Sequence, residues 1–360
     1  MTKYIISVII ILIVVLLCGS TLNQKEYRVK TMNPVNKKVT LKDIAKVLNL
    51  SPRAVSNGLN NSGRLAPQTR EKIIQTATNL GYIPNAAARS LVTKSSNFIG
   101  VLIPYINKSF FCNIIAGISE VTEKNNYMIL LDSLDKESKE RKEAVIYSLI
   151  QHNVAGIILF PRTEDLEIAT LLRSSNIPVI QVMDYFPEFG ELSVTMDNFK
   201  AASIAMQHLI DKGHKNIGFL GANNKTPSQQ ERFRAYKEMR KDQKLLYKFC
   251  NPSLEDGYNK TLELFTENPQ LSAIFATSDA SALGAMRAAK ERNLAIGKDF
   301  SVVGFSDVDI ASNQAFYPLT TVSQPKETTG IKAAEILIAK IRNQKTCSIS
   351  LEAPLVIRKS

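Results

Sequence analysis

The sequence has few of the residues that build disulfide or metal sites. Its 360 residues include four cysteines and three histidines, with no CxxC spacing and no histidine pair close to a cysteine. These spacings fit neither a zinc site nor a disulfide framework. We therefore predict free thiols in a reducing cytosol, with no metal and no cofactor.

Catalytic motifs are also absent. The sequence contains no GxSxG elbow, no P-loop, no HExxH, and no GxGxxG between a strand and a helix. We accordingly predict that the protein is not an enzyme. Its hydrophobic content of 44% and charged content of 22% are ordinary for a soluble globular protein, and its length suits two or three domains.

Acidic residues are scarce near the N-terminus. Between residues 32 and 96, ten lysines and arginines stand against two acidic residues, which gives +8. Residues 1–31 add +3, so only +1 of the total charge of +12 is left for residues 97–360. A positive head on a nearly neutral body is typical of a nucleic-acid-binding protein.

Residues 4–24 carry no charge, and we treat residues 1–31 as a hydrophobic leader. One interpretation is a transmembrane helix, with the lysines and arginines after it favouring a cytoplasmic location for the rest of the chain. A second is a degraded lipoprotein signal ending at Cys18, where Leu17 replaces the usual small residue. A third is that translation starts only at Val29 or Met32.

The positive head has the pattern of a helix-turn-helix. In VTLKDIAKVLNLSPRAVSNGLN (residues 39–60), apolar residues at helical spacing predict a helix over Leu41–Leu48, with Thr40 as its N-cap. Ser51 is expected to cap a second helix that has Pro52 at its first position. A third helix is predicted over residues 67–80, with an apolar face formed by Ile73, Ile74, Ala77 and Leu80.

The second helix is predicted to enter the major groove of DNA, where its N-terminal residues would meet base edges. Arg53 can bind guanine and Asn57 can bind adenine, each through two hydrogen bonds. Gly58 is unexpected, because glycine inside a helix costs about 1 kcal/mol relative to alanine. The residues predicted to contact DNA here are Thr40, Ser51, Pro52, Arg53, Ala54, Ser56 and Asn57.

This pattern, continued by TREKI, ATNLGYIP and NAAARSL, resembles the head of the lac-repressor (LacI/GalR) family of bacterial transcription regulators. The resemblance runs from about residue 39 to residue 358. It implies that residues 84–96 are a hinge and linker, whose segment 85–91 becomes helical only on the operator, with Leu91 wedged into the minor groove. The hinge residues expected at DNA are Asn85, Ala88, Arg89 and Leu91. One departure is Asn57, where the family usually has arginine.

From residue 97 onward, seven short apolar runs alternate with amphipathic segments. This alternation predicts buried parallel strands and an α/β core. The resemblance implies a periplasmic-binding-protein-like core of two subdomains behind the all-α helix-turn-helix head at 39–83. Within the core at 97–358, the first subdomain is expected at about 97–196 and 324–347, and the second at about 197–323 and 348–358.

The resemblance also implies an effector pocket between the two subdomains, after the strand ends. Aromatic side chains would stack on a sugar or base ring, and an arginine would fix its hydroxyl or carboxylate groups. The matching positions are Phe110, Phe111, Asp184, Arg232, Asp279, Ser306 and Asp307. Ser306 departs from the family, because it lacks the carboxylate that commonly binds sugar hydroxyls.

These features predict a DNA-binding transcriptional regulator, a repressor whose operator affinity is controlled by a sugar or related metabolite. The chain ends without a heptad repeat, so we expect a homodimer on a two-fold operator. The expected location is the cytoplasm, at the nucleoid, with membrane tethering through residues 4–24 left open. The alternative is an exported or lipid-anchored sugar-binding protein, which would give the basic head no role.

Overall fold

The computed structural model describes residues 39–82, 96–106, 108–134, 138–222, 226–241, 243–312 and 318–360. The chain separates into two compact units, residues 1–84 and 85–360, which we call the head and the core and treat separately. The leader and the predicted hinge segment 85–91 lie outside the described residues. None of the helices in the described ranges has both the length and the hydropathy needed to cross a membrane.

The described part of the head, residues 39–82, contains three helices: α2 (Leu41–Leu48), α3 (Pro52–Leu59) and α4 (Pro67–Asn79). The predicted caps are confirmed. Thr40 forms a capping box with Asp43 at the start of α2, and Ser51 Oγ accepts a hydrogen bond of 3.1 Å from the Ala54 amide at the start of α3. The helices pack on a small core made of Ile44, Ala45, Val55, Ile73 and Ala77.

Close packing of α3 on α4 explains Gly58. A Cβ atom at this position would lie 2.6 Å from Ile73 Cδ1, so glycine lets the two helices approach. The predicted apolar face of α4 was too wide, since Ile74 and Leu80 are 48% and 38% exposed. The helix contacts its neighbours along one narrow stripe, and Leu80 sits at its C-terminal end.

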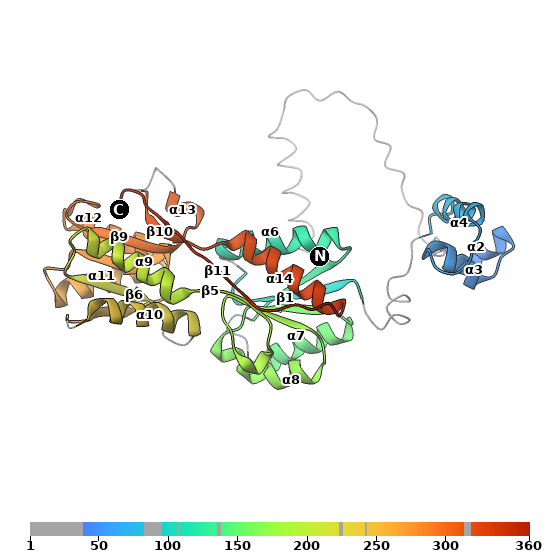
Figure 1. Cartoon of the computed structure of the whole chain (residues 1–360), viewed down its shortest axis with the longest axis horizontal. Helices are drawn as coiled ribbons and strands as arrows, with labels where there is room; N and C mark the ends of the chain where they lie inside the picture. The colour runs from blue at the N-terminus through green and yellow to red at the C-terminus, as the bar shows by residue number, and fades with distance from the viewer. Residues whose placement is uncertain are drawn as a thin grey trace, which may run out of the picture. The chain divides into compact units, whose positions relative to one another are not determined.

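The core has twelve strands within its described residues. In chain order they are β1 (Phe98–Ile103), β2 (Met128–Ser133), β3 (Gly156–Leu159), β4 (Val179–Val182), β5 (Ser193–Met196), β6 (Ile217–Gly221), β7 (Leu246–Phe249), β8 (Ala273–Ala276), β9 (Ser301–Ser306), β10 (Thr320–Ser323), β11 (Ile349–Leu351) and β12 (Leu355–Val356). They form two lobes with one six-stranded sheet each (Figure 1).

The two sheets have matching strand orders. Lobe 1 has the order β11-β5-β4-β3-β1-β2 and lobe 2 has the order β12-β10-β9-β8-β6-β7. The strands of lobe 1 pair in parallel throughout, and in lobe 2 only β12 runs antiparallel to its neighbour. The predicted α/β core is confirmed, and the seven apolar runs coincide with β1–β4, β6, β8 and β9.

Helices cover both faces of each sheet (Figure 1). Lobe 1 carries α6 (Ser109–Lys124), α7 (Lys139–Gln151), α8 (Ala169–Ser174), α14 (Lys326–Ile341) and the short 3-10 helices η1 (Thr163–Ile168) and η2 (Pro187–Phe189). Lobe 2 carries α9 (Asn198–Asp211), α10 (Pro227–Arg240), α11 (Leu254–Glu267), α12 (Asp279–Glu291) and α13 (Asp309–Ser312). Each lobe therefore has a separate hydrophobic cluster on either side of its sheet.

The chain crosses between the lobes three times, after β5, after β10 and after β11. The crossings are tied together: the Ser323 amide donates to the Pro354 carbonyl at 2.8 Å, and Lys200 Nζ lies 3.0 Å from Glu352 Oε1. The third crossing comes later than the sequence suggested. Residues 348–358 were assigned to the second subdomain, but β11 pairs in parallel with β5 in lobe 1.

Candidate functional site

The N-terminal half of α3 presents a small, mostly polar surface. Pro52 and Arg53 are exposed, while Ala54, Ser56 and Asn57 are half-buried. Asn57 is partly engaged within the head, because its Oδ1 accepts a hydrogen bond of 3.4 Å from Ser62 Oγ. Arg53 is therefore the side chain of α3 most accessible to a base edge.

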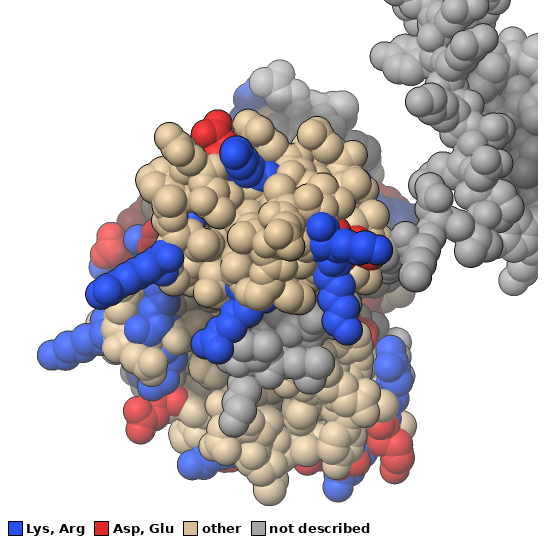
Figure 2. Space-filling view, turned by 90° about the vertical axis from the view of Figure 1, so that its right-hand side faces the viewer, with Lys and Arg blue, Asp and Glu red and all other residues tan. Residues whose placement is uncertain are grey.

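Basic side chains surround this helix. The described part of the head carries Lys42, Lys46, Arg53, Arg64, Arg70 and Lys72, against Asp43 and Glu71. Asp43 is already used in the cap of α2. Figure 2 shows lysine and arginine side chains standing out from this face with few acidic ones between them. Such a surface attracts the phosphate backbone of nucleic acid. The hinge residues Asn85, Ala88, Arg89 and Leu91 lie outside the described residues.

The core contains a cleft of about 860 Å³ where the carboxyl ends of the strands of both lobes meet. Of the seven effector residues taken from the resemblance, six line it: Phe110, Phe111, Asp184, Arg232, Asp279 and Ser306. Asp307 does not line it, since its carboxylate pairs with Arg358 Nη2 at 2.7 Å. This contact joins residues 51 positions apart and has no local signal in the sequence.

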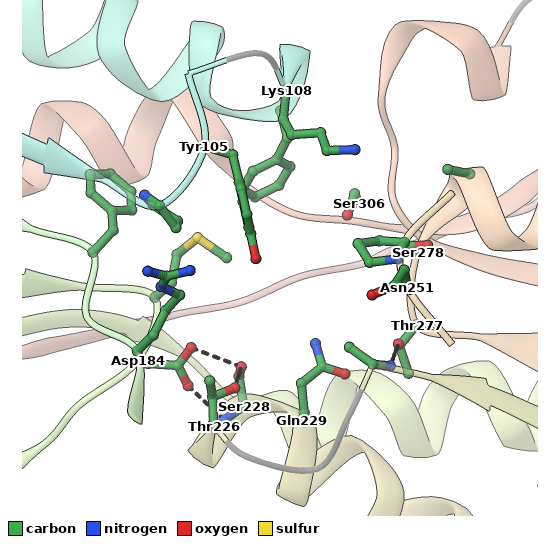
Figure 3. Close-up of a pocket in the computed structure, with 18 of the residues that line it drawn as sticks. Tyr105, Lys108, Asp184, Thr226, Ser228, Gln229, Asn251, Thr277, Ser278 and Ser306 are labelled. Carbon is green, nitrogen blue, oxygen red and sulfur yellow. Dashed lines mark hydrogen bonds between the residues drawn. The ribbon is translucent and has the colours of Figure 1, made fainter. Parts of the chain in front are cut away.

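Lobe 1 supplies an aromatic wall. Phe110 contacts Phe111 edge to face at a centroid distance of 5.2 Å, and Phe111 contacts Phe160 in the same way at 5.6 Å. Phe111 is only 7% exposed and belongs to the hydrophobic cluster of the lobe, whereas Phe110 is half-buried. Tyr105 projects toward the centre of the cleft (Figure 3). Phe111 is thus mainly a core residue that supports Phe110.

Asp184 connects the two lobes directly. It follows β4 of lobe 1, after Met183 with a φ of 74°, and accepts hydrogen bonds from Ser228 N at 2.7 Å and Ser228 Oγ at 3.0 Å. Ser228 lies in the first turn of α10 in lobe 2, so the carboxylate caps that helix across the cleft (Figure 3). Burial raises the pKa of Asp184 above its ordinary value, against the opposing effect of these hydrogen bonds.

Arg232 lies at the lobe-2 side of the cleft and is 3% exposed. Its Nε donates to Asn198 Oδ1 at 2.9 Å, and its Nη1 donates to the Thr277 carbonyl at 3.3 Å. Its guanidinium carbon stands 3.8 Å from the centroid of the Phe305 ring. Burial lowers the pKa of Arg232 to about 10, against the opposing effect of the nearby Asp184 charge.

Asp279 and Ser306 are held by lobe 2 itself. Asp279 accepts from Thr321 Oγ1 at 2.5 Å and from the Val308 amide at 2.9 Å, so its carboxylate fastens the loop after β9. Ser278, not Asp279, caps α12. Ser306 has a φ of 130° and accepts a hydrogen bond from Gln324 Nε2 at 3.0 Å.

Several cleft residues were missed from the sequence. They are mostly polar and come from lobe 2: Thr226, Gln229, Asn251, Thr277 and Ser278, together with Tyr105 and Lys108 from lobe 1. Gln229 Oε1 is buried and has no hydrogen-bond partner among the described residues. The signal that could have found them is position, because most of them directly follow a strand or begin the next helix.

The described residues contain no group of three or more histidine, cysteine or acidic side chains placed to hold a metal ion. Among the described residues, Cys112, Cys250 and Cys347 are free thiols. Neither observation supports a metal or disulfide role for the residues that the structure describes.

Comparison with known proteins agrees with this geometry. Residues 40–85 match the bacterial regulatory proteins of the lacI family, and residues 96–359 match the periplasmic binding proteins and sugar-binding domain of that family. The transcriptional regulator IdnR of Escherichia coli is 32% identical over 314 residues, which cover 86% of this chain and 93% of that protein. The ribose operon repressor of Haemophilus influenzae is 29% identical, with 89% and 98% covered.

Among solved structures, the lac repressor dimer bound to operator and the anti-inducer ONPF superposes with a TM-score of 0.79. The sequences are 25% identical, and the match covers 90% of this chain and 99% of the lac repressor chain. Both units of the chain are thus accounted for, the head by the regulatory domain and the core by the sugar-binding domain. The chain belongs to the lacI family of bacterial regulatory proteins, DNA-binding transcriptional regulators that respond to small-molecule effectors.

Proposed function

We propose that this protein is a repressor that binds a two-fold operator as a homodimer. Its affinity for the operator falls or rises when a sugar-like effector occupies the cleft. The observation that carries the proposal is the pairing of an aromatic wall with a wall of hydroxyl and amide groups. Sugars present apolar ring faces and polar edges, and such a cleft suits both. The lac repressor, a dimer bound to operator in its solved structure, supports the dimer.

The buried acceptor of Gln229 supports a ligand that brings hydrogen-bond donors. Its Oε1 has no partner in the described part of the core, and a buried acceptor without a donor costs about 1–3 kcal/mol. A hydroxyl group of the effector would remove that cost. Arg232, Asn251 and Ser278 would complete the polar side, while Phe110 and Tyr105 would stack on the ring.

The effector would act through the contact between the lobes. Asp184 and Ser228 join the lobes at the edge of the cleft, so a ligand that changes their spacing would alter the relative stability of open and closed cores. We infer that this change reaches the hinge at residues 85–91, with Leu91 as the intercalating side chain. Operator binding and effector binding would then be coupled in both directions.

Catalysis is no part of this proposal, because three of the four carboxylates in the cleft lining, those of Asp184, Asp256 and Asp279, are engaged in structural hydrogen bonds. The proposed place of action is the nucleoid in the cytoplasm. The exported alternative gains no support from the core alone, since it leaves the matched regulatory head unexplained.

Substitution of Arg53 tests the assignment of α3 to the major groove. Arg53→Ala should relax base preference at one position of each half-site and cost about 1–3 kcal/mol of specific binding. Operator selection from a random DNA pool, followed by titration of the selected site, measures both effects. Arg64→Ala, another exposed arginine of the head outside α3, is the matched control and should weaken all sequences alike. An unchanged preference in Arg53→Ala would refute the docking assignment.

A further inference from the structure

The charged side chains that line the cleft are unevenly balanced. Three are cationic, Lys108, Arg162 and Arg232, and four are acidic, Glu164, Asp184, Asp256 and Asp279. A count of residues alone would give a slightly negative cleft. The contacts of each side chain decide which of these groups can bind a ligand.

Three of the four carboxylates are already occupied by protein donors. Asp184 binds Ser228 through two hydrogen bonds, and Asp279 binds Thr321 Oγ1 and the Val308 amide. Asp256 accepts from the Asn251 amide and side chain at 2.6 and 3.0 Å. Burial raises the pKa of Asp184 and of Asp279. Glu164 is exposed to solvent.

Two of the three cations form no ion pair with a described carboxylate. Arg162 is matched by the buried Asp165, 3.4 Å away. Arg232, by contrast, bonds only to an amide oxygen and a carbonyl, and its Nη2 has no hydrogen bond to any described residue. The buried Asp184 acts on this charge electrostatically but forms no ion pair or hydrogen bond with it, so Nη2 can still donate to a ligand.

Lys108 adds a second available charge from lobe 1. It is exposed, it precedes α6 as the N-cap residue without a side-chain cap hydrogen bond, and no described carboxylate pairs with it. Its ammonium group points across the cleft toward Ser306 (Figure 3). The part of lobe 2 that faces Lys108 thus offers the Ser306 hydroxyl group rather than a carboxylate.

A third cation lies behind Ser306. Lys326 Nζ donates to the Ser306 carbonyl at 2.7 Å and to the Asp307 carbonyl at 2.8 Å, and the Asp307 carboxylate is taken by Arg358. Lys326 therefore fastens the loop after β9 through its backbone carbonyls, while Asp279, Asp307 and Asp309 act on its charge.

We propose that the effector is an acidic sugar, a polyhydroxylated molecule whose carboxylate or phosphate is bound between Lys108 and Arg232. This inference rests on the proposed function and narrows its ligand class. The planar donor fork of Arg232 suits either type of anion, and the positive N-terminal end of α6 adds to the attraction. The hydroxyl groups of the sugar would face Gln229, Asn251 and Ser278.

The experiment is a calorimetric titration of the full-length protein with matched ligand sets at constant ionic strength. The sets are the hexonates and hexuronates, the hexose 6-phosphates, and the neutral hexoses and hexitols of the D-gluco, D-galacto and D-manno series. At least one acidic member is expected to bind about tenfold or more tightly than its neutral counterpart. The carboxylate and phosphate sets distinguish the two sources of negative charge.

Two variants localise the effect. Lys108→Gln should weaken the acidic ligand about tenfold, because it removes one charge-assisted contact, and should leave neutral sugars unchanged. Ser306→Asp places a carboxylate opposite Lys108 and should weaken the acidic ligand at least as much. Lys298→Gln removes an exposed lysine outside the cleft lining and is the matched control.

The failures of the two proposals are distinguishable. Acidic ligands that bind no better than neutral ones, or a Lys108→Gln variant that binds them equally well, overturn the acidic-sugar inference. If a neutral sugar then alters operator affinity, the proposed function stands. A protein that selects no DNA site overturns the proposed function, whatever the ligand sets show.

Discussion

The two walls of the cleft differ in chemistry although the two lobes share one topology. Lobe 1 contributes Tyr105, Phe110, Phe111 and Phe160, whereas lobe 2 contributes mainly hydroxyl, amide and guanidinium groups. The sheets have matching strand orders, and each wall forms at the carboxyl ends of its strands. The difference therefore arises in the residues after the strands and not in the scaffold.

This comparison teaches that the lobes have separate tasks in recognition. An aromatic wall buries the apolar face of a ring and tolerates many ring substituents. A polar wall discriminates, because each buried donor or acceptor left unpaired costs free energy. We expect the aromatic wall of lobe 1 to supply general affinity, and the polar groups of lobe 2, together with Lys108, to decide which ligand is accepted.

The largest effect is expected on lobe 1. Phe111→Ala should lower the free energy of unfolding by about 3–5 kcal/mol, because Phe111 is part of the hydrophobic cluster. Phe110→Ala is the matched variant: it should destabilise much less and instead weaken effector binding. Urea denaturation and ligand titration separate the two. Equal destabilisation by both variants would contradict the assignment of Phe111 as a core residue and Phe110 as a residue that contacts the effector.

On lobe 2, Arg232→Lys should keep one positive charge but lose the planar fork. We expect effector affinity to fall about 10- to 100-fold, which corresponds to one or two charged hydrogen bonds. Arg234→Lys, two residues along α10, alters an exposed arginine that pairs with Glu231 and Glu238 and should bind normally. Ligand titration provides the measurement, and normal binding by Arg232→Lys would show that lobe 2 does not discriminate through this side chain.

The smallest effect concerns the contact between the walls. At neutral pH, Asp184→Asn should change the free energy of unfolding by about 1 kcal/mol through the altered hydrogen bonds to Ser228. Because burial raises the pKa of Asp184, protonation stabilises the wild type at low pH. That contribution is full below the ordinary value of 3.8 and is lost as the pH rises through the folded value.

The variant should therefore gain stability relative to the wild type as the pH rises from 4 to 8, which urea denaturation across this range would measure. Asp279→Asn is the companion, since burial raises the pKa of Asp279 too, but its contacts stay within lobe 2. Both variants should show the same trend with pH, and Asp184→Asn should change the response to effector more than Asp279→Asn, which breaks no contact between the lobes. The same response in both would remove the special role of the contact between the lobes.

Local features of the fold could be predicted from the sequence, and features that depend on distant partners could not. Thr40 and Ser51 were identifiable as caps because their partners lie three residues away. Short strands such as β10 and β11 escaped notice, because they have few residues and contain polar ones. Gly58 could be noticed but not explained before Ile73 was seen beside it.

The same limit applies to the cleft. The resemblance led to Arg232 and Phe110, whose positions are set by the fold as a whole. It could not reveal that Asp307 pairs with Arg358, or that Asp279 is held by Thr321. Lys108 carries no motif at all, and its importance emerges only when the engaged carboxylates are set aside.

The three tied crossings between the lobes have a mechanical consequence. Two lobes joined by a single crossing of the chain can rotate about it in any direction. Three neighbouring crossings, linked by the Ser323–Pro354 and Lys200–Glu352 contacts, resist rotation and sliding of one lobe against the other. Bending is then the easiest motion between the lobes. The two lobes of the core thus bend about one hinge axis. The free energy of ligand binding changes one opening angle between them instead of driving many different motions.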